Sequence, residues 1–273
     1  MKKQFSLAYL TIPGTHPVDQ INIAAQAGYD GVGLRPISQK LPGEADFPFT
    51  DDVIYANVKA ALQDTGIKLM DIELARVADG VDVMSYEPAF DRAAQLGAKS
   101  AIGSIWTSDE AFYLKQITAL CALAAKYGME INFEFVPFSQ IKDLKQTLAL
   151  VKQSGCPNIK ILVDHLHAHR AEVTEDDIKA VPANLLGFPH VCDGPAFIPP
   201  IDHPDMIAVA RGGRNYPGEG GIDIAGLLRS VDAPYYAIEL PNAAEIQLRG
   251  KLGHAKRCLE TTKAYFASHQ IPL

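Results

Sequence analysis

The stretch that decides the fold reads EINFEFVPFSQIKDLKQTLALVKQSGCPNIKILVDH over residues 130–165. Its first residues form an apolar run that predicts a strand, and the amphipathic segment 141–154 predicts a helix that ends before Gly155. A second apolar run, residues 159–165, predicts another strand. A strand, a helix and a second strand in succession are typical of a parallel sheet, because the helix carries the chain back to the same edge.

The same unit recurs along the whole chain, with Gly and Pro between its copies. Eight units over 273 residues predict an α/β protein with a single (β/α)8 TIM barrel, one catalytic domain over residues 1–273. The alternative is an open, doubly wound sheet. Its dinucleotide-binding form needs GxGxxG after the first strand, where residues 11–17 read TIPGTHP. The predicted strands cover residues 5–10, 31–35, 68–74, 100–104, 130–136, 159–165, 185–191 and 235–240.

Composition limits the classes of function. The chain has 25 Lys and Arg residues against 32 Asp and Glu residues, a net charge of −7, which argues against a protein that holds a nucleic-acid backbone. No apolar run approaches the roughly 18 residues of a membrane-spanning helix. The four scattered cysteines form neither a CxxC pair nor a disulfide framework. We therefore expect a cytoplasmic protein without nucleic-acid or membrane partners, and a homo-oligomer remains compatible with the sequence.

Polar side chains end the last four predicted strands. Alternation along the strands points Glu134 and Glu239 into the barrel mouth, while their apolar neighbours face the helices. Three carboxylates that converge there would repel one another unless a cation lies between them. One such residue alone is explained by a salt bridge or a helix cap, but four on successive strands favour a site for one divalent ion, Mn, Mg, Co or Zn. The predicted ligands are Glu134, Asp164, His190 and Glu239.

Several motifs in the expected order resemble those of one known superfamily. The chain is similar to the xylose isomerase-like TIM barrels, which include sugar phosphate isomerases and epimerases, inosose and dehydroshikimate dehydratases, and AP endonucleases. The similarity extends over nearly the whole chain. The motifs that carry it are FEFVPFSQI (133–141), LVDHLHAHR (162–170), PHVCDGP (189–195), RNYPGEGGIDI (214–224) and YAIEL (236–240).

The resemblance implies one divalent metal bound by the four residues that the strand pattern predicts. It also implies that His167, three residues after Asp164, touches the substrate. The proton is then moved by His167 or by a carboxylate ligand, Glu134 or Glu239. An Arg before the PGEGGID segment usually contacts substrate oxygens in this superfamily, which makes Arg214 the nearer candidate and Arg211 the reserve. Asp193 is expected to orient a metal ligand.

Other residues near the predicted mouth are candidates for substrate contact. Trp106 follows the fourth strand, where it either walls the pocket or packs in the core. The loop 197–221 is long and rich in Pro and Gly, so we expect it to cover part of the mouth and to present at least one Arg. For Arg76 a solvated loop charge is the simpler alternative, and for Arg35 the two interpretations are equally good. The arginines that border the mouth and could clamp an anionic group are Arg35, Arg76, Arg211 and Arg214.

One departure from the family pattern leaves two functions open. Keto-sugar 3-epimerases of this superfamily carry a second glutamate shortly after the strand-five ligand, whereas residues 136–140 read VPFSQ, and Gln140 cannot exchange a proton. We expect first a metal-dependent isomerase or epimerase that acts on a small keto-sugar or polyol, phosphorylated or not, through an enediolate. The alternative is a dehydratase of the inosose or dehydroshikimate type. A DNA-repair nuclease is disfavoured, because the second to fourth strands end without a His.

Overall fold

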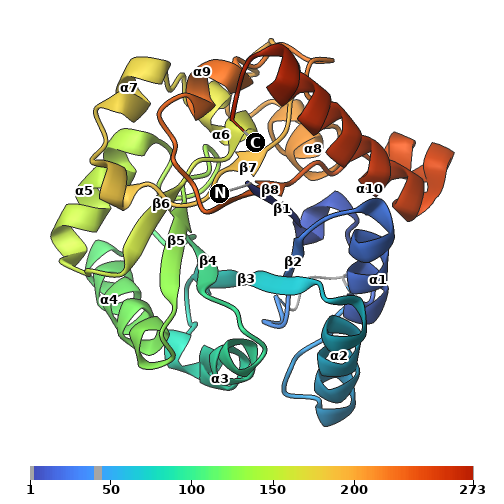
Figure 1. Cartoon of the computed structure of the whole chain (residues 1–273). Coiled ribbons are helices and arrows are strands. Elements are labelled where there is room, and N and C mark those ends of the chain that lie inside the picture. Colours follow the sequence, from blue (N-terminus) through green and yellow to red (C-terminus); the bar gives the residue numbers. More distant parts are fainter. Residues whose placement is uncertain (1–2, 40–44, 273) are drawn as a thin grey trace.

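The computed structural model describes residues 3–39 and 45–272, in which eight parallel strands surround one axis and helices cover their outer face (Figure 1). Hydrogen bonds join the strands in the order β6-β5-β4-β3-β2-β1-β8-β7. Single parallel bridges between Ile161 and Leu186 and between Asp164 and His190 connect the two ends of this series. The predicted (β/α)8 barrel is therefore confirmed. The strands are β1 Gln4–Leu7, β2 Gly31–Leu34, β3 Lys68–Val77, β4 Ser100–Ile105, β5 Glu130–Glu134, β6 Ile159–Leu162, β7 His190–Val191 and β8 Tyr235–Ile238.

The helices begin and end at residues that suit those positions. Pro17 is the first residue of α1, and Gly28 ends that helix in the left-handed conformation with φ 88°. Aspartate side chains accept backbone N–H groups at the starts of α2, α4 and α5. Three short 3₁₀ turns are Tyr9–Thr11, Val83–Tyr86 and Ala183–Leu185. The α-helices are α1 Pro17–Ala27, α2 Asp52–Thr65, α3 Glu87–Gln95, α4 Glu110–Lys126, α5 Leu144–Ser154, α6 His165–Arg170, α7 Glu175–Lys179, α8 Asp205–Gly212, α9 Ile224–Leu228 and α10 Ala243–Ser268.

The core lies on both sides of the strands. All residues of β2, β4 and β8 are buried, because the helices cover the outer face and side chains fill the inside of the barrel. Polar side chains are among the buried residues at the carboxyl ends of the strands, where active sites of such barrels lie. Among the described residues, no helix has the length and apolar character needed to cross a lipid bilayer.

Of the predicted boundaries that differ from the structure, three concern the barrel mouth. The seventh strand is only His190–Val191, because residues 183–185 form a 3₁₀ turn and Pro189 has no N–H to donate. Asp164 is not a strand residue but the N-cap of α6, and its Oδ1 accepts the His167 N–H over 2.9 Å. The loop 197–221 contains α8, whose eight residues were too few for a clear helical pattern.

Candidate metal centre and substrate pocket

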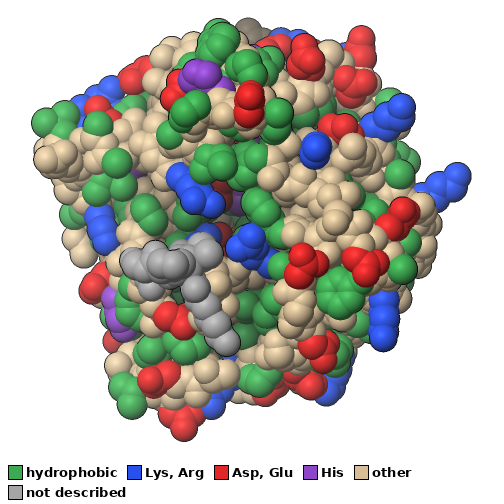
Figure 2. Space-filling model, turned by 180° about the vertical axis from the view of Figure 1, so that it is seen from behind, with side chains coloured by type: hydrophobic (Ala, Val, Ile, Leu, Met, Phe, Trp, Pro, Cys, Tyr) green, Lys and Arg blue, Asp and Glu red, His purple; other side chains and the backbone are tan. Residues whose placement is uncertain are grey.

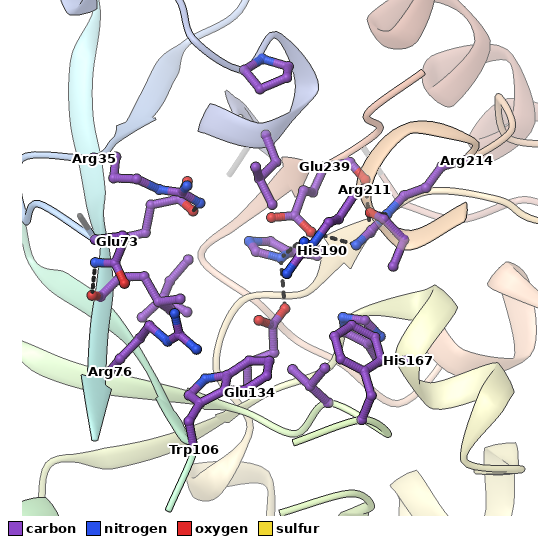
Figure 3. Close-up of a pocket in the computed structure, with 18 of the residues that line it drawn as sticks. Arg35, Glu73, Arg76, Trp106, Glu134, His167, His190, Arg211, Arg214 and Glu239 are labelled. Atoms are coloured by element: carbon purple, nitrogen blue, oxygen red, sulfur yellow. Dashed lines mark hydrogen bonds and ion pairs between the residues drawn. The ribbon is translucent and has the colours of Figure 1, made fainter. Parts of the chain in front are cut away.

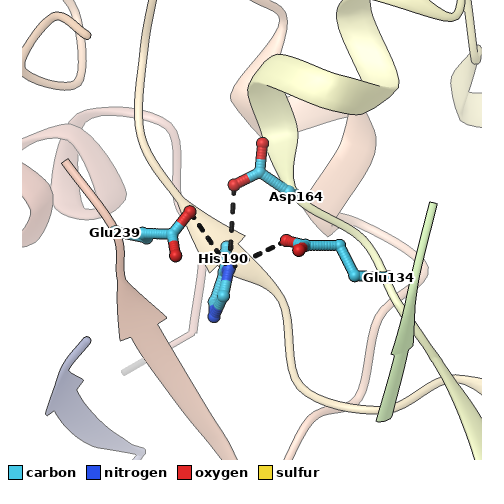
Figure 4. Close-up of side chains that lie close together, drawn as sticks. All are labelled: Glu134, Asp164, His190 and Glu239. Carbon is cyan, nitrogen blue, oxygen red and sulfur yellow. Dashed lines mark hydrogen bonds and ion pairs between the residues drawn. The ribbon is translucent and has the colours of Figure 1, made fainter. Parts of the chain in front are cut away.

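The four polar residues predicted at the strand ends lie together in the barrel mouth (Figure 4). Each offers one ligand atom, and these atoms lie within 4.8 Å of one another. His190 is central: its Nδ1 is 3.2 Å from a Glu134 oxygen, 3.4 Å from a Glu239 oxygen and 3.7 Å from an Asp164 oxygen. Its Nε2 points away from the carboxylates, so Nδ1 is the nitrogen placed to bind an ion.

The charge of this group fits a divalent cation. Three carboxylates are buried together, and the guanidinium of Arg214, itself buried, donates to Asp164 Oδ2 over 2.5 Å and to Glu239 Oε2 over 2.9 Å. Three negative charges and one positive charge leave a net −2, which one divalent ion would neutralise. Three oxygen ligands and one imidazole suit Mn, Mg, Co or Zn. The residues therefore fit the ion, and their role as ligands stays a prediction.

The pKa values of the four groups show how strongly they interact. Burial raises the pKa of Glu134 to about 7, although the His190 hydrogen bond opposes the rise. Burial alone would raise the pKa of Asp164 as well, but the Arg214 guanidinium, together with His167 and His190, outweighs burial and holds that pKa well below its usual range. The pKa of Glu239 is likewise lowered, because His190 and Arg214 outweigh burial. Burial opposes protonation of His190, but the Glu239 and Glu134 carboxylates outweigh burial and raise the pKa of His190 well above its usual value. In the absence of an ion, the imidazole therefore takes up a proton among the carboxylates.

A cavity of about 610 Å³ opens above the quartet (Figure 3). Side chains from β3, β4, β5 and β7 line it, together with residues that follow the carboxyl ends of other strands, such as Arg35 and Glu239. Every residue predicted to contact substrate lines it, and so does Arg76. On the face shown in Figure 2, basic side chains border a central hollow with acidic side chains visible inside it. The predicted contact residues that line the cavity are Arg35, Trp106, His167, Arg211 and Arg214.

The Arg214 guanidinium is already occupied by hydrogen bonds within the protein. In addition to its two carboxylate partners, its Nη1 donates to the Glu239 carbonyl oxygen over 3.0 Å and its Nε donates to the Ala210 carbonyl oxygen over 3.2 Å. The side chain is 1% exposed. Its first role is therefore that of a counter-ion to the carboxylates. Arg211, in the last turn of α8, reaches the cavity without these constraints.

The opposite wall contains a buried ion pair that sequence analysis missed. The Glu73 carboxylate accepts from Arg35 Nη2 over 2.9 Å and from the Tyr9 backbone N–H over 3.2 Å. The Arg35 guanidinium also stacks on the Tyr9 ring, 4.1 Å from its centroid. Burial raises the pKa of Glu73, and Arg35 opposes the rise. The available signal was Asp71 and Glu73 at alternate positions of one apolar strand, which points both carboxylates inward.

Arg76 and Trp106 form the next part of this wall. The Arg76 guanidinium lies over the indole, 4.3 Å from the ring centroid, and the indole Nε1 donates to Ser104 Oγ over 2.8 Å. Both side chains line the cavity. Trp106 thus walls the pocket rather than packing in the core, and Arg76 is a pocket residue rather than a solvated loop charge.

His167 is the one imidazole outside the quartet among the described residues that line the cavity. It is 4% exposed, and the Phe138 ring packs edge-on against it at 5.8 Å. Burial lowers the pKa of His167 to about 4, although the Asp164 carboxylate opposes the change. At neutral pH the ring is therefore uncharged and able to accept a proton.

The loop after β5 brings no acid or base into the cavity. Val136 and Phe138 line it, whereas Gln140 lines a separate groove beside α4 and α5. Ser139 is turned back, because its hydroxyl donates to the Ile141 carbonyl oxygen over 3.0 Å. The second glutamate of the keto-sugar 3-epimerases, which is missing from this loop in the sequence, is therefore not replaced by another acid or base of the same loop in the structure.

Asp193 does not orient a metal ligand, contrary to expectation. Its carboxylate accepts four backbone N–H groups at 2.8–3.0 Å, all from its own turn and from the loop that follows Arg214. At Gly220 an added Cβ would lie 2.3 Å from Asp193 Oδ1, so only glycine fits. Asp193 therefore shapes the loop that carries Arg214. The donors are Gly194, Gly218, Gly220 and Ile222.

Known proteins resemble this chain in sequence and in fold. A 3-dehydroshikimate dehydratase of Pseudomonas putida is 24% identical over 251 residues, which cover 85% of this chain but only 36% of that protein. The chain thus spans about a third of the length of the curated relatives that it matches. The IolI protein, solved with a bound zinc atom, superposes with a TM-score of 0.78 at 17% identity and covers 97% of this chain and 99% of its own.

An epimerase has the same fold. The D-allulose 3-epimerase of a Methylomonas species superposes with a TM-score of 0.68 at 18% identity, over 97% of this chain and 99% of its own. The family model described as xylose isomerase-like TIM barrel matches residues 21–260. These residues include all four side chains of the quartet and the loop that carries Arg214. The chain belongs to the xylose isomerase-like TIM barrel family.

Proposed function

We propose that the protein is a divalent-metal-dependent dehydratase that removes water from a small cyclic hydroxy-ketone bearing a carboxylate, the class to which 3-dehydroshikimate belongs. The carrying observation is that one uncharged imidazole, His167, faces the cavity beside the quartet while the loop after β5 offers no carboxylate. The sequence similarity to 3-dehydroshikimate dehydratases supports the same reaction. Sequence analysis placed an isomerase first; we now place the dehydratase first, because a single imidazole and no second carboxylate from the loop after β5 support it.

The number of proton-active groups separates the two reactions. In the elimination, one base removes the proton from the carbon next to the carbonyl, and the hydroxyl on the next carbon leaves with its bonding electrons. The same group then returns the proton to the leaving hydroxyl, so the products are an unsaturated ketone and one water molecule. From 3-dehydroshikimate this ketone is a cyclic dienone, which becomes aromatic when a ring CH2 loses a proton and the carbonyl oxygen gains one. Epimerisation needs a proton taken from one face of the carbon and another delivered to the opposite face.

His167 has the properties that a single base requires. Its ring is uncharged at neutral pH and packs against Phe138, which keeps bulk water from one side. The imidazolium formed by proton uptake lies near the Asp164 carboxylate, whose charge favours it. The quartet would hold the metal through His190 Nδ1 and three carboxylate oxygens. When bound, the ion would act as a Lewis acid toward the substrate carbonyl.

The arginines on the opposite wall fit the carboxylate of such a substrate. The Arg76 guanidinium lies over the Trp106 ring, 4.3 Å from its centroid, and both side chains line the cavity. Arg35 is fixed beside it by Glu73, and Arg211 approaches from α8. Planar guanidinium groups bind carboxylates through paired hydrogen bonds. The cavity thus combines a metal site for the hydroxy-ketone with a basic wall for the acid.

A single assay tests this proposal. The protein with added Mn²⁺ is incubated with 3-dehydroshikimate in deuterated water, and the product is followed by absorbance and mass. Loss of one water molecule together with a new aromatic absorbance is the expected result. A product of unchanged formula that carries deuterium on carbon would overturn the proposal in favour of an isomerase or epimerase.

An epimerase is the second candidate, because Glu73 adds a buried carboxylate to the wall opposite the quartet. Glu73 and Glu239 reach the cavity from opposite sides of the barrel (Figure 3). Glu73 is occupied by two hydrogen bonds in the structure, and it would have to leave Arg35 to act. Glu73→Gln separates the candidates, because it would abolish epimerisation and leave elimination by His167 within a few-fold of its rate.

A further inference from the structure

A buried histidine behind the candidate metal centre has no part in the proposed reaction. His254 in α10 is fully buried, and both its ring nitrogens have partners. Nε2 lies 2.9 Å from the Leu240 carbonyl oxygen, and Nδ1 lies 2.8 Å from the Tyr216 hydroxyl. A carbonyl oxygen only accepts, so Nε2 carries the proton. Burial keeps the pKa of His254 below its usual value, and Nδ1 of the neutral ring accepts from the Tyr216 hydroxyl.

The hydrogen bond from His254 to the Leu240 carbonyl oxygen fixes the backbone next to Glu239. Leu240 follows that residue directly, and its carbonyl accepts from His254 while its N–H donates to Thr11 Oγ1 over 3.1 Å. The Thr11 hydroxyl donates in turn to the Ile238 carbonyl oxygen over 2.7 Å. β8 ends at Ile238, and the Glu239 N–H still donates to the Val191 carbonyl oxygen over 3.2 Å. The Thr11 and His254 side chains hold the backbone on either side of that bond.

The hydrogen bond between His254 and the Tyr216 hydroxyl fixes the loop that carries Arg214. Tyr216 is two residues further on, and the Arg214 N–H donates to the Pro241 carbonyl oxygen over 3.1 Å. The Arg214 carbonyl oxygen accepts from Asn242 Nδ2 over 2.9 Å. Asn242 Oδ1 caps α10 by accepting the Glu245 N–H, and Glu245 Oε2 lies 3.1 Å from the Tyr216 hydroxyl. The Tyr216 hydroxyl has one proton, so it donates to either His254 Nδ1 or Glu245 Oε2 at a time. The hydrogen bonds of the Arg214 backbone with Pro241 and Asn242 join the loop to the start of α10.

We propose that Tyr216 and His254 are positioning residues that hold Arg214 against Glu239 and thereby set the geometry of the candidate metal centre. Neither side chain is among those that line the cavity, so they act through the backbone of the two residues that do. The contact that they secure is the 2.9 Å ion pair between Arg214 Nη2 and Glu239 Oε2. The inference rests on the proposed metal site, and its test includes a readout that needs no metal.

The first readout is amide hydrogen exchange of the metal-free protein. In Tyr216→Phe and His254→Leu, the expected result is an exchange rate at least about tenfold higher in peptides covering residues 212–217 and 239–243. Tyr55→Phe is the matched control, because it also removes one tyrosine hydrogen bond, to Gln95, far from the site. It should leave both peptides at wild-type rates.

The second readout is the dissociation constant of Mn²⁺, measured by calorimetry. Loss of groups that orient metal ligands typically weakens binding about 10–100-fold, and Tyr216→Phe and His254→Leu should fall in this range. His254→Gln supplies a side-chain nitrogen in the place of Nε2 and should stay within about threefold of wild type. His269→Gln is its control, at an exposed histidine that caps the C-terminal end of the same helix.

The outcomes are separable. Wild-type exchange and wild-type Mn²⁺ affinity in Tyr216→Phe would overturn the inference, even if His254→Leu does not fold. Faster amide exchange with an unchanged Mn²⁺ affinity would also overturn the inference. It would mean that Tyr216 and His254 order the two segments without affecting the metal site. A wild-type protein that binds no Mn²⁺ would refute the proposed function, and the exchange rates alone would then decide whether the two residues hold the loops.

Discussion

The guanidinium of Arg214 donates to Asp164 over 2.5 Å although 50 residues separate the two in sequence, and both side chains are buried. A buried charge without a partner is strongly unfavourable, so each of these residues stabilises the other. The pair also joins the last part of the chain to the candidate metal centre. Removal of the cation is therefore informative about the site.

Arg214→Met should destabilise the metal-free protein by about 3–5 kcal/mol, because it leaves three buried carboxylates without a counter-ion. Saturating Mn²⁺ should then raise the melting temperature more in the variant than in wild type, since the ion replaces part of the lost charge. Thermal unfolding with and without Mn²⁺ measures both effects. Arg229→Met, which removes an exposed ion pair with Glu175, is the control and should cost less than about 1 kcal/mol. Equal metal-induced shifts in wild type and Arg214→Met would contradict the prediction.

His167→Ala should lower the rate of the proposed elimination by roughly 10²–10⁴, because the base is lost. Its metal content should not change, since His167 is not a predicted ligand. Metal analysis and single-turnover kinetics of the same preparation test both statements. His169→Ala removes an exposed imidazole from the same short helix and should keep the wild-type rate. Near-normal turnover in His167→Ala would exclude this residue as the base.

Arg76→Met should raise KM for an anionic substrate by about tenfold and change kcat by no more than a few-fold. The methionine keeps an apolar contact with Trp106 but loses the cation, so binding weakens in ground state and transition state alike. Steady-state kinetics at two salt concentrations measure the change, and the wild-type KM should depend more strongly on salt. If kcat falls and KM is unchanged, Arg76 does not act in this way.

Asp71→Asn should change how stability depends on pH. Asp71 is buried and accepts from the Tyr235 hydroxyl over 3.1 Å, and burial together with nearby Glu73 raises its pKa from 3.8 to about 7. Between these two values the folded protein retains a proton that the unfolded chain has lost. The stability that this proton contributes is fully present below pH 3.8 and is lost as the pH rises to about 7.

Urea unfolding at several pH values tests this prediction. The free energy of unfolding of wild type should fall between pH 4 and pH 7 by up to a few kcal/mol relative to Asp71→Asn, at about 1.4 kcal/mol for each pKa unit. The asparagine keeps an acceptor for Tyr235 and does not titrate. A constant difference between the two proteins across this range would show that Asp71 ionises normally.

The sequence by itself predicted the barrel and the four residues of the candidate metal centre. The reason is geometric: the carboxyl ends of successive parallel strands meet at one end of a barrel, so Glu134, Asp164, His190 and Glu239 had to converge once the strands were recognised. The boundaries were less well predicted where elements are short. α6 starts directly after its strand and α8 has eight residues, too few for a periodic pattern to stand out.

Only the tertiary structure decided which partners the buried charges take. Glu73 pairs with Arg35 from the neighbouring strand, and Arg214 turns to Asp164 and Glu239 rather than to open solvent. Asp193 binds the backbone of a loop 25–29 residues away. No local pattern encodes these choices, because each depends on which group lies within hydrogen-bonding distance after packing has excluded water. The sequence thus fixes what reaches the barrel mouth, and packing decides which of those groups neutralise one another and which remain for substrate.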